Sequence, residues 1–268
     1  MCTVTAVLLQ GGACCSIGDA PVLRVICNRD EARARADAIP PLRREFADRT
    51  AILPIDPLSQ GTWIGVNDAG LVLCLLNASL QGPFLAPSRP LRSRGDIIPS
   101  LLDCDSVAEI VARVDRVNPH DFPPFRLLAI TRDHLAVLAS DHSTLRVQHA
   151  QPMVDPFFIT SSSLGDEIVE MPRRKLFYEV LRTAPDLEAA QSQFHTHQWP
   201  GRLHLSVQMA RADARTVSRT VVEVASGYAR MTYHSVTDSP LAQNAPRQDS
   251  SALAAPMTLK LCAAGAAA

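Results

Sequence analysis

The sequence contains almost no lysine: Lys175 and Lys260 are the only two among 26 basic residues, and arginine supplies the rest. Together with the high alanine content, this bias reflects coding preference and carries no functional signal. An excess of charge of one sign is also missing, because the formal net charge is −1 at pH 7. Neither nucleic acid nor an anionic membrane is therefore expected as a partner.

Long apolar runs are missing as well, so no segment predicts a membrane-spanning helix. The first basic residue is Arg24, and the apolar run before Gln10 is short, which does not fit a secretory signal peptide. The seven cysteines are odd in number and include no Cys-x-x-Cys pair, so their spacing suits neither a disulfide framework nor a zinc site. We therefore expect a protein of the reducing cytoplasm without a metal centre.

The 268 residues, with 47% hydrophobic and 20% charged, are typical of a globular protein with a sizeable core. Residues 3–9 and 22–27 predict two strands that could form a hairpin around Gly18 and Asp19. Residues 62–66 and 71–76 predict a second hairpin across the turn-rich tetrad 67–70. Further strands are predicted at 125–131, 135–139, 145–149, 157–160, 205–209, 216–224 and 228–234, and helices at 94–102, 107–117, 172–181 and 187–194.

Strands and helices follow one another in blocks, which favours two packed sheets with helices outside over a doubly wound sheet. The charged stretch 29–49 contains Pro40 and Pro41 and is predicted to be a solvated loop with at most a short helix. We expect a single domain over residues 1–237. Residues 238–268 are rich in Ala, Ser, Pro and Gln without periodicity, and we expect a disordered tail there.

The strongest functional signal is Cys2, directly after Met1 and before an apolar strand. Because its side chain is small, Cys2 permits removal of the initiator methionine, which would place a thiol and a free α-amine on one residue. An α-amine has a pKa of about 7.7–8.0, so it can act as the base for its own thiol near neutral pH. Many chains begin with Met-Cys by chance, so this signal needs support from the rest of the sequence.

Support comes from residues 28–31, Asn-Arg-Asp-Glu, at the end of the second predicted strand. If the first two strands pair, this strand end lies beside Cys2. A carboxylate there could hold the α-ammonium, and an arginine could lower the pKa of the thiol. Alternatively, this is simply a strand end that runs into a charged loop.

Four motifs occur in a characteristic order: Met1–Cys2, Asn28–Glu31, Gly61–Asn67 with Gly70 and Asn77, and Ser93–Asp96. On these motifs the chain resembles the NRDE family, which includes the transport and Golgi organisation protein 2 group, over roughly residues 1–235. The resemblance implies an α+β fold of the N-terminal nucleophile (Ntn) hydrolase type. In this fold two stacked antiparallel sheets lie between helix layers, giving a four-layer αββα sandwich.

The same resemblance implies distant kinship with cysteine amidohydrolases of the choloylglycine hydrolase and penicillin acylase type. By motif position, Cys2 resembles the nucleophile, Asp30 its supporting acid, and Asn77 a donor to the oxyanion. Arg29 is a further catalytic candidate. The substrate, a linear amide or acyl compound, would contact the residues Asn28, Trp63 and Ser161.

The sequence also departs from those hydrolases. Cys27 stands where they place an arginine, and residues 160–163 contain no asparagine to serve as a second oxyanion donor. For the downstream arginine motif, Arg215 and Arg219 are both candidates. These departures keep an alternative open, a non-catalytic protein on the same scaffold that handles haem or a lipid such as acyl-CoA, as the resemblance implies for some members. No cofactor is expected apart from haem as a ligand under that alternative.

His195 and His197 could be read as two metal ligands, but no third ligand has a convincing spacing. These residues are instead expected to end an exposed helix.

Overall fold

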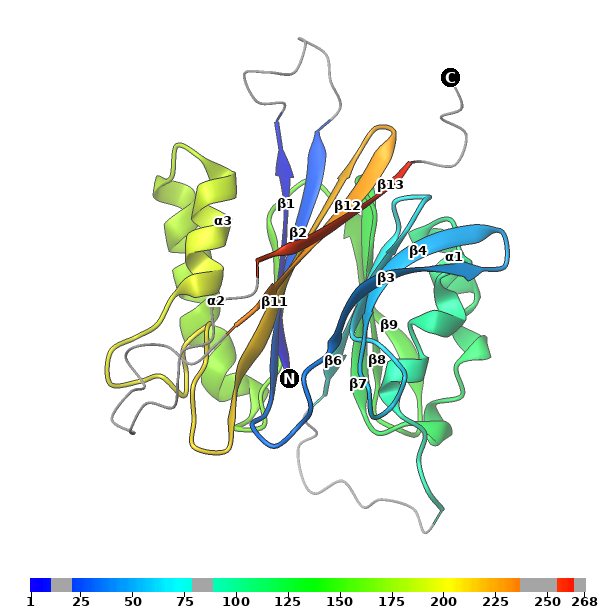
Figure 1. Ribbon diagram of the computed structural model, residues 1–268, viewed down its shortest axis with the longest axis horizontal. Coiled ribbons are helices and arrows are strands. Elements are labelled where there is room, and N and C mark those ends of the chain that lie inside the picture. The colour runs from blue at the N-terminus through cyan, green and yellow to red at the C-terminus, as the bar shows by residue number, and fades with distance from the viewer. Residues whose placement is uncertain (11–20, 79–88, 237–254, 263–268) are drawn as a thin grey trace.

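The computed structural model describes residues 1–10, 21–78, 89–236 and 255–262. The predicted turn around Gly18 and Asp19 lies outside these residues, as do 238–254 and 263–268 of the predicted tail. Two antiparallel sheets stack face to face, with helices on the outer side of each (Figure 1). This is the four-layer αββα sandwich expected from the sequence.

Sheet A has six strands in the order β10-β1-β2-β11-β12-β13. Their bounds are β1 Cys2–Leu9, β2 Val22–Ala32, β10 Phe157–Thr160, β11 Ala214–Ala225, β12 Tyr228–Ser235 and β13 Met257–Cys262. The predicted pairing of the first two strands is confirmed. The prediction of an irregular tail is wrong at β13, which pairs with β12 along the edge of the sheet.

Sheet B has seven strands in sequence order, β3 to β9. Their bounds are β3 Ile39–Phe46, β4 Arg49–Ile55, β5 Ile64–Asn67, β6 Val72–Asn77, β7 Phe125–Ile130, β8 His134–Ser140 and β9 Leu145–Pro152. The hairpin predicted over 62–76 is confirmed as β5 and β6. The loop predicted over 29–49 is wrong, because β2 continues to Ala32 and β3 and β4 form a further hairpin.

Three hydrophobic clusters fill the spaces between the layers. The largest lies between the two sheets and contains the apolar side chains of β1 and β2 together with those of β5 and β6. A second lies between sheet B and the short helix α1 (Val107–Ala112), which Ser106 caps through its side chain. A third lies between sheet A and helices α2 (Asp166–Thr183) and α3 (Leu187–Thr196).

Two further predictions of secondary structure differ from the fold. Residues 94–102, predicted as a helix, form two 3-10 turns, η1 (Arg94–Asp96) and η2 (Pro99–Leu101). Residues 205–209, predicted as a strand, form turns. Val207 and Met209 are buried, yet the carbonyl oxygens of Leu205 and Ser206 accept hydrogen bonds from a side chain of α2 and not from a neighbouring strand. No helix within the described ranges is long and apolar enough to cross a membrane.

Candidate active site

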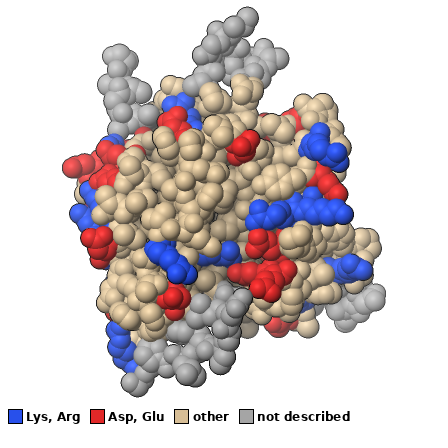
Figure 2. Space-filling model, turned by 180° about the vertical axis from the view of Figure 1, so that it is seen from behind, with Lys and Arg blue, Asp and Glu red and all other residues tan. Residues whose placement is uncertain are grey.

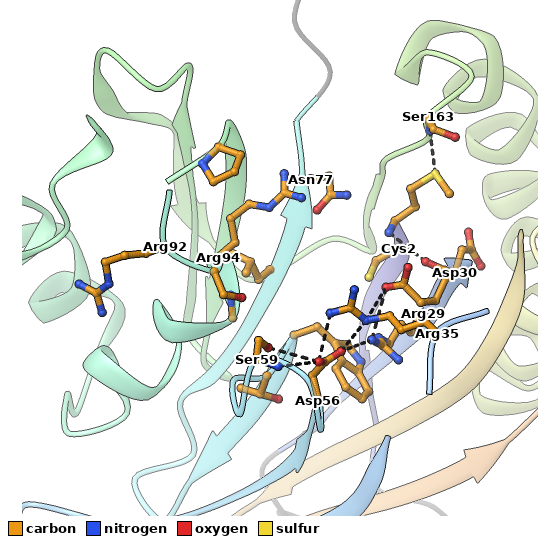
Figure 3. Close-up of a pocket in the computed structure, with 18 residues that line it drawn as sticks. Cys2, Arg29, Asp30, Arg35, Asp56, Ser59, Asn77, Arg92, Arg94 and Ser163 are labelled. Atoms are coloured by element: carbon orange, nitrogen blue, oxygen red, sulfur yellow. Dashed lines mark hydrogen bonds and ion pairs between the residues drawn. The ribbon is translucent and has the colours of Figure 1, made fainter. Parts of the chain in front are cut away.

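A cavity of about 430 Å³ lies where the first residues of β1 approach β6 and η1 (Figure 3). Cys2, Arg29, Asp30, Trp63 and Asn77 line it, so five of the seven predicted site residues meet there. The other described lining residues are Met1, Glu31, Arg35, Asp56, Ser59, Thr62, Leu75, Arg92, Ser93, Arg94, Gly95, Pro123 and Ser163.

Cys2 is the first residue of β1, and strand pairing places it directly opposite Arg29 on β2. Its side chain is only 4% exposed. Its backbone nitrogen donates to Ser161 Oγ at 3.1 Å, and its carbonyl oxygen accepts from the Ser161 nitrogen at 2.9 Å. Ser161 therefore holds the nitrogen that would become the α-amine if Met1 were removed.

The surroundings of Cys2 lower the pKa of its thiol. The largest cause is a hydrogen bond from the thiol of Cys27, which lies two residues before Arg29 on the same face of β2. Burial opposes this lowering of the pKa, and the positive charges of the Met1 amine and of Arg29 support it. The same hydrogen bond, together with burial, raises the pKa of Cys27 well above its ordinary value. Cys27 is thus a neutral hydrogen-bond donor to the Cys2 thiol.

Asp30 follows on β2 and is 2% exposed. Its backbone exchanges two hydrogen bonds with Met1, from Asp30 N to Met1 O at 2.7 Å and from Met1 N to Asp30 O at 3.0 Å. Its carboxylate accepts from Thr216 Oγ1 at 2.6 Å. Burial raises the pKa of Asp30, and the positive charge of Arg173 and the Thr216 hydrogen bond oppose that rise.

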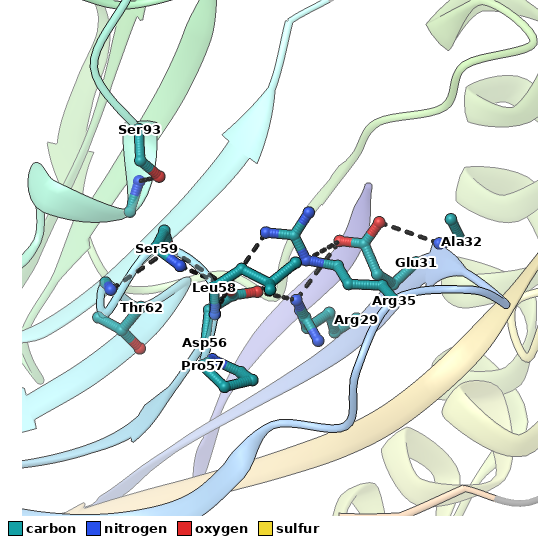
Figure 4. Close-up of polar contacts among 12 residues, drawn as sticks. Arg29, Glu31, Ala32, Arg35, Asp56, Pro57, Leu58, Ser59, Thr62 and Ser93 are labelled. Atoms are coloured by element: carbon teal, nitrogen blue, oxygen red, sulfur yellow. Dashed lines mark hydrogen bonds and ion pairs between the residues drawn. The ribbon is translucent and has the colours of Figure 1, made fainter.

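Asp56 is a site residue that the sequence analysis missed. It accepts from Arg29 Nη2 at 2.7 Å and from Arg35 Nε at 2.8 Å, and the backbone nitrogen of Ser59 donates to its other oxygen at 3.0 Å (Figure 4). Burial by itself would raise the pKa of Asp56, but the hydrogen bonds from Arg35 and Ser59 outweigh it and lower the pKa. Asp56 therefore neutralises and fixes Arg29, whose guanidinium stacks 4.3 Å from the centre of the Trp63 ring.

The opposite wall carries Asn77, at the end of β6, and Arg94, at the start of η1. The η1 turn packs closely on the start of β5: a Cβ atom on Gly61 would lie 2.4 Å from the Gly95 carbonyl carbon. In addition, the Thr62 nitrogen donates to Gly95 O at 3.0 Å. Only glycine permits this approach, so Gly61 fixes the turn that carries Arg94.

Four of the residues singled out in the sequence do not line the cavity within the described structure. Asn28 points to the opposite face of β2, as strand alternation requires, and donates to His195 O at 2.8 Å and Val207 O at 3.1 Å. Asn28 therefore does not line the cavity in which a substrate would bind. Ser161 does not line it either, and is hydrogen-bonded to the backbone of Cys2. Arg215 donates to Val236 O, Arg219 pairs with Asn28 across the strands, and neither arginine is among the residues that line the cavity.

His195 is fully buried, so the prediction of an exposed helix end is wrong at this residue. Its Nε2 lies 2.8 Å from Thr5 Oγ1 and its Nδ1 lies 3.1 Å from Asn28 Oδ1. Burial lowers the pKa of His195 well below its ordinary value, and the charge of Arg219 adds to this effect. Within the described residues, no group of three or more His, Cys, Asp or Glu side chains could hold a metal ion.

Because the folded state lowers the pKa of His195, protons bind the unfolded chain more readily, and stability should fall as pH falls. The loss begins near the unfolded pKa of 6.5 and continues down to the folded pKa, with a slope of up to about 1.4 kcal/mol per pH unit. Urea unfolding at a series of pH values from neutrality downward measures it. We expect His195→Gln to flatten the pH dependence and His134→Gln, at an exposed strand end, to leave it unchanged. Equal slopes of the free energy of unfolding against pH for wild type and H195Q would contradict the conclusion that His195 has a lowered pKa in the folded protein.

The fold has counterparts among solved structures. A cysteine-to-alanine mutant of the conjugated bile acid hydrolase from Clostridium perfringens superposes with a TM-score of 0.51 at 11% identity, covering 88% of this chain and 89% of that one. An arginine-to-leucine variant of the same hydrolase gives a TM-score of 0.51 at 9% identity over 86% and 89%. The N-acylethanolamine-hydrolyzing acid amidase ortholog of Caenorhabditis elegans gives 0.48 at 15% over 81% and 91%. No curated protein matches the sequence significantly.

The two stacked sheets, with Cys2 at the start of an inner strand, give the chain an Ntn-hydrolase-like fold. Residues 20–198 match the family described as Transport and Golgi organisation 2, and the chain belongs to that family.

Proposed function

We propose that Cys2, after removal of Met1, is the nucleophile of a hydrolase or acyltransferase that acts on a linear amide or acyl substrate in the cytoplasm. The observation that carries this proposal is the position of the Cys2 thiol, on the wall of a cavity and with a lowered pKa. A thiol of lowered pKa supplies more of the thiolate, which is the attacking form.

In the first step, the Cys2 α-amine takes the proton of the thiol, the sulfur attacks the carbonyl carbon of the substrate, and the carbonyl oxygen becomes an oxyanion. The amide of Asn77, which lines the cavity, would donate to that oxyanion. The carbon–nitrogen bond then breaks, the Cys2 α-amine delivers a proton to the leaving amine, and an acyl-enzyme remains. Water or a second amine attacks the acyl-enzyme and regenerates the thiol. Ser161 would hold the α-amine in place during these steps, and the negative charge of Asp30 nearby would stabilise its protonated form.

A limiting amount of iodoacetamide tests the proposal, followed by digestion and mass spectrometry of the peptides. We expect Met1 to be absent and Cys2 to be alkylated well ahead of the other cysteines. Cys74 is the internal comparison, because it is also buried between the sheets but burial raises its pKa. Retained Met1, or Cys2 labelling no faster than Cys74 labelling, would remove the main support for the nucleophile.

The alternative, non-catalytic handling of haem or an acyl-CoA type of lipid, would use the same cavity. Arg94 on its wall favours such ligands, because haem carries carboxylate groups and acyl-CoA carries phosphate groups. Among the described lining residues, the thiol of Cys2 and the thioether of Met1 would be the groups able to hold haem through its iron, since no histidine lines the cavity there. In this role Cys2 would need no thiolate reactivity, so the labelling experiment separates the two functions.

A further inference from the structure

The arginines around the cavity differ in how their charge is balanced. Arg29 and Arg35 share Asp56, at 2.7 and 2.8 Å, and Glu31 lies within ion-pair distance of both. Arg92 pairs with Asp96 at 3.4 Å and stacks on Phe122. These three guanidinium groups are therefore neutralised within the protein.

The charge of the Arg94 guanidinium is not neutralised in this way. Its Nη1 donates to the Pro124 carbonyl oxygen at 2.9 Å, and no carboxylate forms an ion pair with it in the part of the chain that the structure describes. Burial lowers the pKa of Arg94, and the more distant negative charges of Glu31 and the Cys2 thiolate only partly oppose that shift. A half-buried guanidinium without a counter-ion is costly, and an anionic ligand would relieve that cost.

The position of Arg94 places such a ligand within reach of the reaction. In Figure 3 the Arg94 side chain extends along the cavity wall to Asn77, on the side opposite Cys2. The turn that carries it cannot easily withdraw, since Gly61 and Gly95 are in close backbone contact. An anionic group bound by Arg94 would thus lie beside the carbonyl oxygen that faces Asn77.

We propose that Arg94 is the recognition site for an anionic group, a carboxylate or a phosphate, carried by the substrate close to the carbonyl that Cys2 attacks. This inference rests on the proposed function and narrows it from any linear amide or acyl compound to an acidic one. It also assigns a role to the Ser93–Asp96 motif: the motif forms the turn on which Arg94 is presented, with Ser93 Oγ accepting from the Gly95 nitrogen at 3.1 Å.

Two alkylating agents of nearly equal size test the proposal on the full-length protein. Iodoacetate carries the carboxylate that Arg94 would bind, and iodoacetamide is its neutral counterpart. The rate of Cys2 labelling by each gives a ratio in which the intrinsic reactivity of the thiol cancels. We expect Arg94→Ala to lower the iodoacetate-to-iodoacetamide ratio by about tenfold, as for loss of a charge-assisted hydrogen bond, and Arg94→Lys to restore part of it. Arg116→Ala, which removes an exposed arginine of η3 (Val114–Arg116), is the matched control and should leave the ratio unchanged.

A second measurement needs no variant. Succinate or inorganic phosphate should slow the labelling of wild-type Cys2 by iodoacetamide, whereas chloride at the same ionic strength should not. An iodoacetate-to-iodoacetamide ratio that is equal in wild type and R94A, or protection by chloride equal to that by succinate and phosphate, would overturn the assignment. Protection by one of the two anions alone identifies which group the site takes. Failure of the proposed function looks different, since Cys2 would then label slowly with both reagents.

Discussion

Arg173→Ala is expected to lower the free energy of unfolding by about 3–5 kcal/mol, because it removes one partner of a buried charged network. The Arg173 side chain is 1% exposed and lies between α2 and sheet A. It donates to Thr3 Oγ1 at 2.8 Å and to Thr160 Oγ1 at 3.0 Å. It also satisfies the carbonyl oxygens of the turn at 205–206 and provides positive charge that stabilises the buried Asp30 carboxylate.

Urea unfolding followed by circular dichroism measures this effect. Arg174→Ala is the matched control, because Arg174 is the next residue of the same helix. Its side chain is 40% exposed and pairs with Glu170 one turn away, which contributes at most about 0.5 kcal/mol. It also lies 5.1 Å from the centre of the Phe158 ring, a contact worth about 0.5–1 kcal/mol at an exposed site. If the two variants were equally stable, Arg173 would be shown to contribute nothing beyond an ordinary surface arginine.

Cys2→Ala is expected to abolish acyl transfer, by a factor of about 10³ or more, while leaving the fold intact. The reason is that the α-amine, Asn77 and Asp30 have no nucleophile to assist once the thiol is gone. Incubation with an activated acyl ester, followed by intact-mass measurement, shows the acyl-enzyme directly. The wild-type mass should rise by one acyl group, and the C2A mass should not change.

Cys74→Ala serves as the control, since it removes another buried thiol without touching the cavity wall. It should acylate like wild type. Acylation of C2A at the wild-type rate would rule out the nucleophilic mechanism. Binding of acyl-CoA by both wild type and C2A, combined with no acylation of wild type, would instead support the non-catalytic function.

The hairpins that carry the site could be predicted from the sequence because their signals are local. Apolar runs bounded by turn residues identify β1, β2, β5 and β6, and pairing of the first two brings Cys2 to Arg29. The β3–β4 hairpin could not be found in this way. β3 is an edge strand with most side chains exposed and two prolines, so its composition is that of a charged loop.

The partners of the site residues were harder to predict for a different reason. Asp56 lies 27 residues from Arg29, and Ser161 lies 159 residues from Cys2, so no spacing in the sequence links them. His195 looked like a polar helix end, because the side chains that satisfy it, Thr5 and Asn28, come from strands about 170–190 residues earlier. Such contacts can be identified only from the three-dimensional arrangement of the sheets and helices.

The distance along the chain between Cys2 and its partners also sets the order of events during synthesis. Thr216, which binds the Asp30 carboxylate, is 186 residues from it. At about 5–20 residues per second, the ribosome needs on the order of ten seconds or more to deliver that residue after the N-terminus has emerged. Until then the first strand has no completed sheet to enter, and Met1 is open to the peptidase that trims nascent chains. Once the sheet closes, hydrogen bonds between Met1 and Asp30 hold the methionine in place. Under the proposed function, trimming of Met1 would compete with folding, and the fraction of molecules with a free Cys2 amine would depend on which is faster.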